Sequence, residues 1–419
     1  MTRALVYGAS PGAGPGRLLA PRPPSVDVDP QVLDHLRAQP LGLYELDDEE
    51  PRSSPVGVVC APRLAGVCGS DARLMLGDFS VDDVDNPMAA FTVLPFVLGH
   101  EVVADVVAAD ADTGLNPGDR VVLNPWLSCL PRGLEDCAAC SRGDLAQCER
   151  FLEGGIGPGL HLGVAAGAAG AFASRFTAHP GQLHRVPDSV SDAAAVLADP
   201  FSVSLHAILR TPPPLGGRAL VIGAGALGTM AVAILRRTFP DVEIAVLCRY
   251  GHQREAATRL GAHLVVDHEP RDAALEALAR FANTTLRPAL DGLAMAYPGG
   301  VDVIYDTVGS AQTLELGVRA ATMRGRVVLL GVATPRRFEW TPIYFKELTV
   351  TGSSGFGIET VEGERRHAID HYLAACADGL DLAWLVTHTD TLEGYLDVCA
   401  VLATPARSGV LKAAFTPNA

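Results

Sequence analysis

The hydrophobic pattern of the chain changes near residue 190. Before that point, short β-branched runs alternate with turns rich in Gly and Pro, which is typical of an antiparallel, barrel-like domain. After residue 218, apolar strand-like runs alternate with helical segments, which is typical of a parallel sheet covered by helices on both faces. The sequence therefore predicts an α/β protein with two different domains.

In the barrel-like part, apolar runs predict strands at residues 4–7, 56–60, 97–107 and 120–123. Residues 10–54 hold a dense Pro/Gly passage and a short helix-like piece at 30–39. Because Pro and Gly break regular elements, we expect a surface excursion there. Ala, Leu and Val at helical spacing predict a helix over residues 191–209 that joins the two domains.

The second half begins with a strand, a glycine turn, a helix and another strand. Its strands are expected at residues 219–222, 242–247, 264–266, 301–305, 326–330 and 348–350. A first helix is expected at 227–237, and residues 273–293 are expected to form an additional helical insert. The pattern of residues 352–419 predicts helices at 361–377 and 392–402 and a last strand at 409–415.

Composition narrows the class of protein. A chain of 419 residues, 48% hydrophobic and 19% charged, is long enough for two cores. Its net charge of -15 argues against nucleic acid or an anionic membrane as the main partner. We find no secretory signal and no uninterrupted apolar run long enough to span a membrane. Four of the nine cysteines crowd together, which favours metal thiolates in a reducing cytoplasm over a disulfide framework.

A glycine turn follows the strand at 219–222 and opens the helix after it. Its residues are Gly223, Ala224, Gly225, Ala226, Leu227 and Gly228. The first Gly permits a tight turn, the second lets backbone approach a pyrophosphate, and the third allows close packing of helix on strand. The helix N-terminus offers free N–H groups to phosphates. We interpret the turn as a dinucleotide site; the alternative is a glycine-rich turn that binds nothing.

At the end of the next strand the sequence reads Cys248, Arg249 and Tyr250. An NAD site normally places Asp or Glu there, on the ribose hydroxyls. Without that carboxylate, and with Arg249 able to bind a 2′-phosphate, NADP is favoured over NAD. The alternative is that Arg249 only stacks on the adenine while NAD binds.

Two groups of metal-ligand residues stand out. Cys137, Cys140 and Cys148, with Cys129 upstream, are expected to close a tetrahedral structural zinc site. Cys129 is the candidate for the fourth ligand, with a longer spacing to Cys137 than is usual; the alternative is a metal-free or redox-active loop.

The second group is expected to hold a catalytic zinc, which takes three protein ligands and keeps one position open. Cys68 and His100 come from separate loops, and Glu101 and Asp199 are the candidates for the third ligand. We favour Asp199, which precedes Pro200 where the domains should meet, with Glu101 as a neighbour or exchanging ligand. Alone, each of these residues could be structural: a buried Cys, a hydrogen-bonded His, or an Asp at a helix N-cap.

These motifs together resemble the zinc-dependent medium-chain dehydrogenase/reductase superfamily, which includes alcohol and polyol dehydrogenases. The resemblance covers nearly the whole chain and includes residues 66–71, 99–101, 118–121, 170–173 and 408–412, besides the cysteine loop and the glycine turn. It implies a GroES-like β-barrel catalytic domain at 1–200, a Rossmann doubly wound cofactor domain at 201–350, and a return to the catalytic domain at 351–419.

The resemblance also implies an activity. Zinc would polarise the oxygen of a small alcohol, aldehyde or ketone, Ser70 would relay its proton, and NADP(H) or NAD(H) would exchange the hydride. It implies further cofactor-lining residues at strand ends, namely Thr307, Val308, Gly309, Gly331, Val332 and Ser353. A homodimer or homotetramer is expected. The rival readings are a zinc-free reductase of the same fold and a non-catalytic nucleotide-binding protein. The insertions at 10–54 and 77–94 have no assigned role.

Overall fold

The computed structural model describes residues 1–9, 15–46, 57–77, 90–165, 167–333 and 336–419. The contacts within the chain divide it into two compact units. The barrel unit comprises Met1–Asp199 and Gly357–Ala419, and the parallel-sheet unit comprises Pro200–Phe356. The predicted insertion at 77–94 lies largely outside the described residues.

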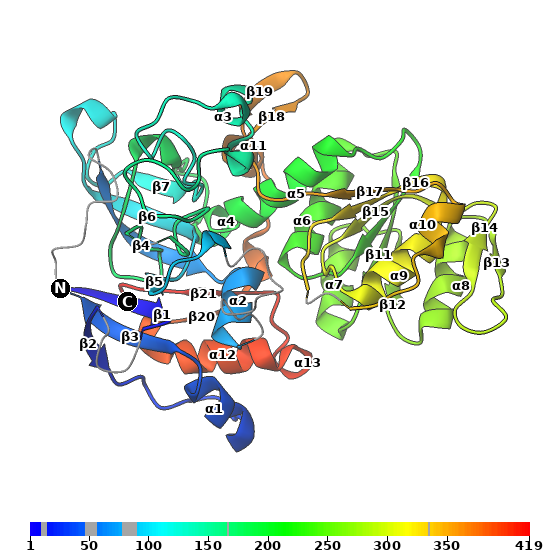
Figure 1. The fold of residues 1–419 in the computed structure, drawn as a ribbon, viewed down its shortest axis with the longest axis horizontal. Coiled ribbons are helices and arrows are strands. Elements are labelled where there is room, and N and C mark those ends of the chain that lie inside the picture. The colour runs from blue at the N-terminus through cyan, green and yellow to red at the C-terminus, as the bar shows by residue number, and fades with distance from the viewer. Residues whose placement is uncertain (10–14, 47–56, 78–89, 166, 334–335) are drawn as a thin grey trace. The chain divides into compact units, whose positions relative to one another are not determined.

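Two antiparallel-rich sheets form the barrel unit. One has the order β2-β3-β1-β5, and the other has the order β20-β21-β4-β6-β7-β9 with β8 paired to β4 (Figure 1). The strands are β1 (Thr2–Tyr7), β2 (Gly16–Leu19), β3 (Leu41–Leu46), β4 (Val58–Gly66), β5 (Phe96–Val97), β6 (Glu101–Ala108), β7 (Arg120–Leu123), β8 (Phe176–Ala178), β9 (Leu183–Arg185), β20 (Val386–Asp390) and β21 (Lys412–Phe415). One continuous core joins both sheets, with Leu5, Leu43, Val102 and Phe415 among its buried members.

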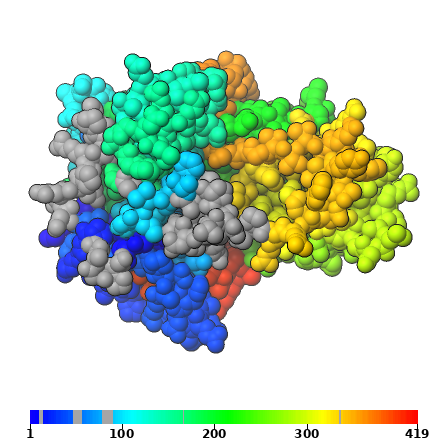
Figure 2. Space-filling model, viewed as in Figure 1, coloured from blue at the N-terminus to red at the C-terminus, as the bar shows by residue number. Residues whose placement is uncertain are grey.

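The helices of the barrel unit are short. They are α1 (Pro30–Arg37), α2 (Gly69–Met75), α3 (Ala138–Arg142), α4 (Asp192–Ala195), α11 (Ala368–Ala377), α12 (Tyr395–Ala403) and α13 (Pro405–Ser408). Helix α1 packs against α12, and blue N-terminal and red C-terminal atoms lie side by side on the face shown in Figure 2.

The expectation of a mere surface excursion at residues 10–54 is wrong for its described part. Strand β3 pairs with β1 along its whole length and buries Leu43 in the main core. The segment before α1 is fixed by Asp397, whose carboxylate accepts hydrogen bonds from the Ser25 N–H and hydroxyl, both at 2.8 Å. Pro and Gly shape the connections here, while the alternating leucines of β3 still form a strand.

The parallel-sheet unit has the strand order β12-β11-β10-β15-β16-β17, with every pairing parallel. Its sheet strands are β10 (Arg218–Ile222), β11 (Glu243–Cys248), β12 (Leu264–Asp267), β15 (Val301–Asp306), β16 (Ala321–Leu329) and β17 (Thr349–Gly352). Its helices are α6 (Ala226–Thr238), α7 (Gly251–Arg259), α8 (Arg271–Phe281), α9 (Ala311–Ala320) and α10 (Thr341–Phe345), and α5 (Ala198–Arg210) leads into it. The central strands are buried on both faces, and the chain order reverses beside β10, as in a Rossmann fold. The predicted doubly wound sheet is confirmed.

Three predicted helices differ from the structure. The helix expected at 191–209 is broken between α4 and α5, because Pro200 lacks an N–H and starts a new helix near its N-terminus. The insert expected at 273–293 is helical only in α8; a hairpin of β13 (Thr285–Arg287) and β14 (Met295–Tyr297) follows.

The helix expected at 361–377 is also wrong in its first turns. Glu362 and Gly363 both have positive φ, of 51° and 85°. Two successive residues of this kind form a tight hairpin turn, here between β18 (Ile358–Val361) and β19 (Glu364–His367). Helix α11 begins only after it.

One segment, Asp192–Arg210, has the length and hydropathy of a membrane span, and 78% of it is buried inside the protein, as in a core helix.

Candidate functional site

Cys68, His100 and Glu101 meet in the barrel unit, each with a ligand atom within 4.8 Å of the other two. Cys68 is the N-cap of α2, and Glu101 opens β6. The turn before His100 needs Gly99, whose φ is +92° and whose added Cβ would lie 2.4 Å from the Phe172 ring. Local backbone geometry therefore brings two distant loops together.

Asp71 lies behind both ligands. Its carboxylate accepts a hydrogen bond from the Cys68 N–H at 3.1 Å and lies 3.6 Å from His100 Nδ1. This contact leaves Nε2 as the His100 nitrogen facing away from the carboxylate, the arrangement usual for a metal-binding histidine. Burial opposes a charged Asp71, but the neighbouring His100 lowers its pKa overall.

Glu101 forms a buried ion pair with Lys412 of β21, and both side chains are 2% exposed. Lys412 Nζ also donates to the Val67 carbonyl at 2.9 Å. Gly66 makes room for the pair, since its added Cβ would lie 2.5 Å from Glu101 Oε2. The pair thus needs β4, β6 and β21 in register.

Asp199, the favoured third ligand, is buried in the same unit but is not among the three residues that meet within 4.8 Å. Burial raises the pKa of Asp199 to about 7, and Glu101 adds to the rise while His100 and Lys412 oppose it. It therefore belongs to the same electrostatic cluster. Ser70 is exposed in the first turn of α2, beside the buried Asp71.

The donor set fits a divalent cation. The cluster contains three buried carboxylates, those of Asp71, Glu101 and Asp199, but one buried ammonium, that of Lys412, which pairs with Glu101. Burial lowers the pKa of His100, but the negative charges of Asp71 and Cys68 raise it well above its usual value overall. A cluster that attracts a proton this strongly also attracts a metal ion, and thiolate, imidazole and carboxylate are zinc ligands.

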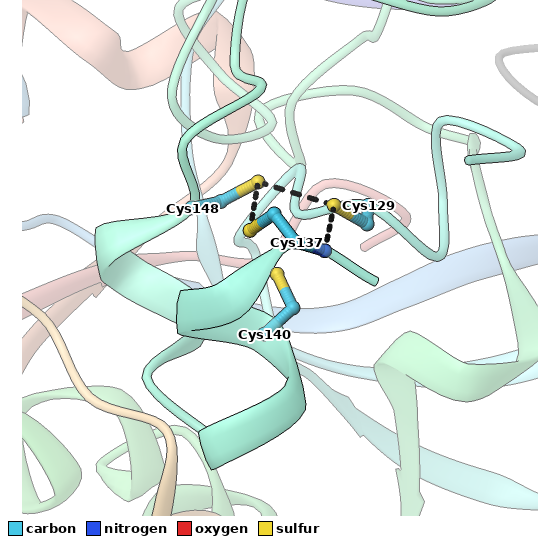
Figure 3. A group of neighbouring side chains, drawn as sticks. All are labelled: Cys129, Cys137, Cys140 and Cys148. Atoms are coloured by element: carbon cyan, nitrogen blue, oxygen red, sulfur yellow. Dashed lines mark hydrogen bonds between the residues drawn. The ribbon is translucent and has the colours of Figure 1, made fainter. Parts of the chain in front are cut away.

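The four clustered cysteines form a second group, with their sulfurs converging from the loop and α3 (Figure 3). Cys148 Sγ lies 3.6 Å from Cys129 Sγ and 4.0 Å from Cys137 Sγ. Four thiolates around one zinc stand about 3.8 Å apart, given Zn–S bonds of about 2.3 Å. The structure thus brings Cys129 to the other three despite its spacing.

Backbone amides support thiolates in this group. The N–H groups of Cys137 and Arg150 donate to Cys129 and Cys148 sulfurs, both at 3.3 Å. Burial opposes ionisation of Cys137, yet hydrogen bonds from the Cys140 and Glu149 N–H groups lower its pKa to about 6. Burial raises the pKa of Cys140, and that of Cys148 to about 11, so these two thiols ionise only when a cation is bound beside them. All four residues are buried and unbridged, which fits a structural zinc.

In the parallel-sheet unit, the glycine turn joins β10 to α6. Gly223 has φ +89°, and an added Cβ at Gly228 would lie 1.9 Å from the Gly223 carbonyl oxygen. Nothing lies within 4 Å of a Cβ added at Gly225, which caps α6. Ala226 and Leu227 form its first turn. The turn therefore leaves open backbone at a helix N-terminus, where a pyrophosphate binds.

The remaining predicted cofactor residues lie at or just past the C-terminal ends of neighbouring strands. Thr307 Oγ1 donates to the Ile222 carbonyl at 2.8 Å, and Gly309 approaches Gly331 so closely that a Cβ would meet its oxygen at 1.9 Å. Val308 and Val332 are exposed, and the Ser353 N–H donates to the Leu329 carbonyl. Cys248 is buried at the end of β11, and Arg249 is exposed after it.

Sequence reasoning missed several residues of these sites. Asp306 is fully buried, and its Oδ1 accepts from the Val308 and Gly309 N–H groups at 3.0 and 2.9 Å. Lys412 was seen only as part of a motif, without its partner. His161, whose ring lies 4.6 Å from that of His100, sits in a loop with no recognisable pattern.

Comparison with known proteins agrees with this geometry. Residues 54–188 match the alcohol dehydrogenase GroES-like domain, which confirms the expected barrel, and residues 226–374 match the zinc-binding dehydrogenase domain. An L-threonine 3-dehydrogenase of Deinococcus deserti is 27% identical over 83% of this chain and 88% of its own.

Two solved structures share the fold. The 2R,3R-butanediol dehydrogenase of Bacillus subtilis has a TM-score of 0.68 and 23% identity over 90% of this chain and 96% of its own. The alcohol dehydrogenase TADH of Thermus sp. ATN1 has a TM-score of 0.67 and 25% identity, again over 90% and 96%. The chain is thus an oxidoreductase of the zinc-type alcohol dehydrogenase class. The chain belongs to the zinc-dependent medium-chain dehydrogenase/reductase family.

Proposed function

We propose that this chain interconverts a small alcohol and its aldehyde or ketone, with zinc held by Cys68, His100 and Asp199 and with NADP(H) as the hydride carrier. The proposal rests on one observation: the Cys68 thiol, the His100 imidazole and the Glu101 carboxylate converge within 4.8 Å, and Asp199 is buried in the same acidic cluster. The cysteine group would hold a second, structural zinc.

The choice of Asp199 over Glu101 as third ligand rests on charge. Lys412 already neutralises Glu101, so its carboxylate has less to gain from a cation. Asp199 carries no such ion pair among the described residues, and burial raises its pKa. Glu101, whose carboxylate lies within 4.8 Å of the Cys68 and His100 ligand atoms, would be the neighbouring acid beside the ion.

When bound, zinc supplies a Lewis acid that polarises the substrate oxygen. Asp71 holds the His100 ring from the Nδ1 side. Ser70 Oγ, exposed at the start of α2, accepts the hydroxyl proton and passes it to water. In the other unit, the open backbone at Gly225 and the N-terminus of α6 hold the pyrophosphate of the dinucleotide.

NADP is favoured because no acid is free at the end of β11. Asp267, which lies opposite Cys248 in the pairing of β11 with β12, forms an ion pair with Arg254 at 2.5 Å. We also propose a homodimer or homotetramer, and a reducing compartment such as the cytoplasm, which fits nine unbridged cysteines.

The test measures the number of zinc ions bound per chain, together with alcohol oxidation. The wild-type chain should carry two zinc ions and oxidise an alcohol from a test panel with NADP. Cys68→Ala should retain one zinc and lose alcohol oxidation by about a thousandfold or more, since the metal contributes several kcal/mol to the transition state. Asp199→Asn and Glu101→Gln then compare the two acids, and only Asp199→Asn should release the ion. Unchanged alcohol oxidation by Cys68→Ala would refute the assignment.

A further inference from the structure

His161 packs directly on the candidate zinc ligand His100. The two ring centroids are 4.6 Å apart and the planes are inclined at 50°. On its other side, the His161 ring meets Trp126 edge-on at 5.7 Å. His161 Nδ1 donates to the Leu162 carbonyl at 2.6 Å, which fixes the ring in its own loop. The His161 ring is therefore held between Trp126 and its own loop, and it packs directly on the His100 ring.

The orientation of the His100 ring depends on a neighbour of this kind. The torsion that rotates a histidine ring about its Cβ–Cγ bond is broad, so the ring depends on its neighbours for its orientation. The Asp71 carboxylate lies 3.6 Å from Nδ1, which is too long for a strong hydrogen bond. Asp71 alone therefore does not determine where Nε2 points.

The loop that carries His161 also holds the backbone of His100. Gly163 lies so close that an added Cβ would be 2.9 Å from the Gly99 carbonyl oxygen. Farther along the same loop, the Ala171 N–H donates to that carbonyl at 2.8 Å. Ring and backbone of His100 are thus restrained by one segment.

Arg132 anchors this segment to the cysteine lobe, residues 129–148, which carries the four clustered cysteines. It lies in the stretch between Cys129 and Cys137 and is only 3% exposed. Its guanidinium donates to the Leu127 carbonyl at 2.8 Å, before the cysteines, and to the Gly159 carbonyl at 2.7 Å, two residues before His161. It also donates to the Glu153 and Ile156 carbonyls, both at 2.8 Å.

We propose that His161 is a positioning residue of the catalytic zinc site, which orients the His100 imidazole by ring packing, and that Arg132 fixes the loop that presents it. The inference rests on the proposed function of Cys68 and His100 as zinc ligands. It assigns the long spacing between Cys129 and Cys137 a role, since that stretch supplies Arg132.

The test measures zinc affinity rather than turnover. In the full-length protein, competition with a chromophoric chelator should resolve two zinc ions. His161→Ala should weaken the site that Cys68→Ala removes by about tenfold or more, as losses around metal ligands do. His161→Phe, which keeps a flat ring, should retain wild-type affinity. The cysteine-lobe zinc should be unchanged in both variants.

Controls separate the possible outcomes. His179→Ala removes another barrel-unit histidine, whose Nδ1 accepts a hydrogen bond from the Gly181 N–H of its own turn at 3.0 Å, and should match the wild type. Wild-type affinity in His161→Ala would overturn the inference, and so would a loss in His161→Phe equal to that in His161→Ala. If the wild type itself binds one zinc or none, the proposed function fails instead.

Arg132→Met provides a second test, of the role of Arg132. Methionine keeps much of the volume but none of the donors, so it should weaken the same zinc as His161→Ala while the cysteine-lobe zinc stays bound. A variant that keeps both ions at wild-type affinity would refute the role of Arg132. If the lobe itself unfolds, seen as loss of its zinc, the His161→Ala and His161→Phe pair still decides the proposal.

Discussion

Arg249 lies one residue beyond β11 and is held in an open, preformed position. Its N–H donates to Gln253 Oε1 at 3.1 Å, and its guanidinium carbon lies 5.5 Å from the centre of the Tyr250 ring. The Arg249 side chain is exposed, so a phosphate can reach it without displacing a buried partner. A planar, permanently charged guanidinium binds phosphate through two hydrogen bonds.

We therefore expect Arg249→Ala to weaken NADP binding by about tenfold to a hundredfold, the loss of one or two charge-assisted hydrogen bonds. NAD, which lacks the 2′-phosphate, should bind nearly as before. Calorimetric titration of both dinucleotides checks this, with the exposed Arg280→Ala on α8 as control. An equal loss for both dinucleotides would mean that Arg249 stacks on the adenine.

At this scale, sequence reasoning found residues whose chemistry is local. Cys68, His100 and the four clustered cysteines stand in short motifs with ligand spacing. Lys412 could not be linked to Glu101 because the two lie on strands far apart in the chain, and only the pairing of β21 with β4, and of β4 with β6, brings them together. His161 acts through packing, and side-chain packing leaves no motif with a fixed spacing in the sequence.

Helix α9 ends on a buried lysine contributed by another element. Lys346, the residue after α10, is fully buried and donates to the Arg319 and Ala321 carbonyls at 2.9 and 2.5 Å. A helix leaves its last carbonyls unpaired, and a cation there also meets the negative end of the helix dipole. Burial, with repulsion from Arg319, lowers the pKa of Lys346 to about 7.

The lowered pKa of Lys346 predicts that the stability of the protein depends on pH. Between about pH 7 and pH 10.5 the unfolded lysine keeps its proton while the folded one loses it. The unfolded state then binds more protons, so the contribution of Lys346 to the free energy of unfolding rises with pH, by about 1.4 kcal/mol per unit at most. Below pH 7 this contribution is flat.

Lys346→Met should lack that slope. Urea unfolding of the wild type and the variant at several pH values between 7 and 9.5 gives the difference directly, and Arg280→Met serves as a control that keeps the wild-type slope. Parallel pH curves for wild type and Lys346→Met would contradict the prediction.

At the scale of elements, strands were predicted better than the ends of helices. Buried parallel strands read as continuous apolar runs, so β10, β11 and β15 were found within a residue or two. The errors fell where backbone conformation overrides composition: at Pro200, at the hairpin after α8, and at the positive-φ pair Glu362 and Gly363. Helical spacing of alanines and leucines does not reveal such breaks.

Over the whole molecule, the metal candidates and the dinucleotide candidates are segregated. Every predicted zinc ligand belongs to the barrel unit, and every predicted cofactor residue belongs to the parallel-sheet unit. The latter has its own core around Leu220, Ile304 and Val327. A compact unit with its own core has the means to fold alone.

We therefore expect the excised fragment 200–356 to melt cooperatively, contain no zinc and bind NADP with an affinity near that of the full chain. Gly225→Asp in this fragment is the matched control. Its side chain meets no atom within 4 Å of Cβ, so the fold should persist while the carboxylate repels the pyrophosphate. A fragment without a cooperative transition would show that the unit depends on the rest of the chain.

The position of β21 has a consequence for the order of synthesis. This strand lies between β20 and β4, and its Lys412 reaches the Val67 carbonyl, 345 residues away, and Glu101. A ribosome therefore releases the complete parallel-sheet unit well before the last strand emerges. Until then the barrel has a gap beside β4, and Glu101 has no counter-charge from Lys412. Nascent or truncated chains that lack β21 can thus acquire the dinucleotide fold while the metal pocket is still without Lys412.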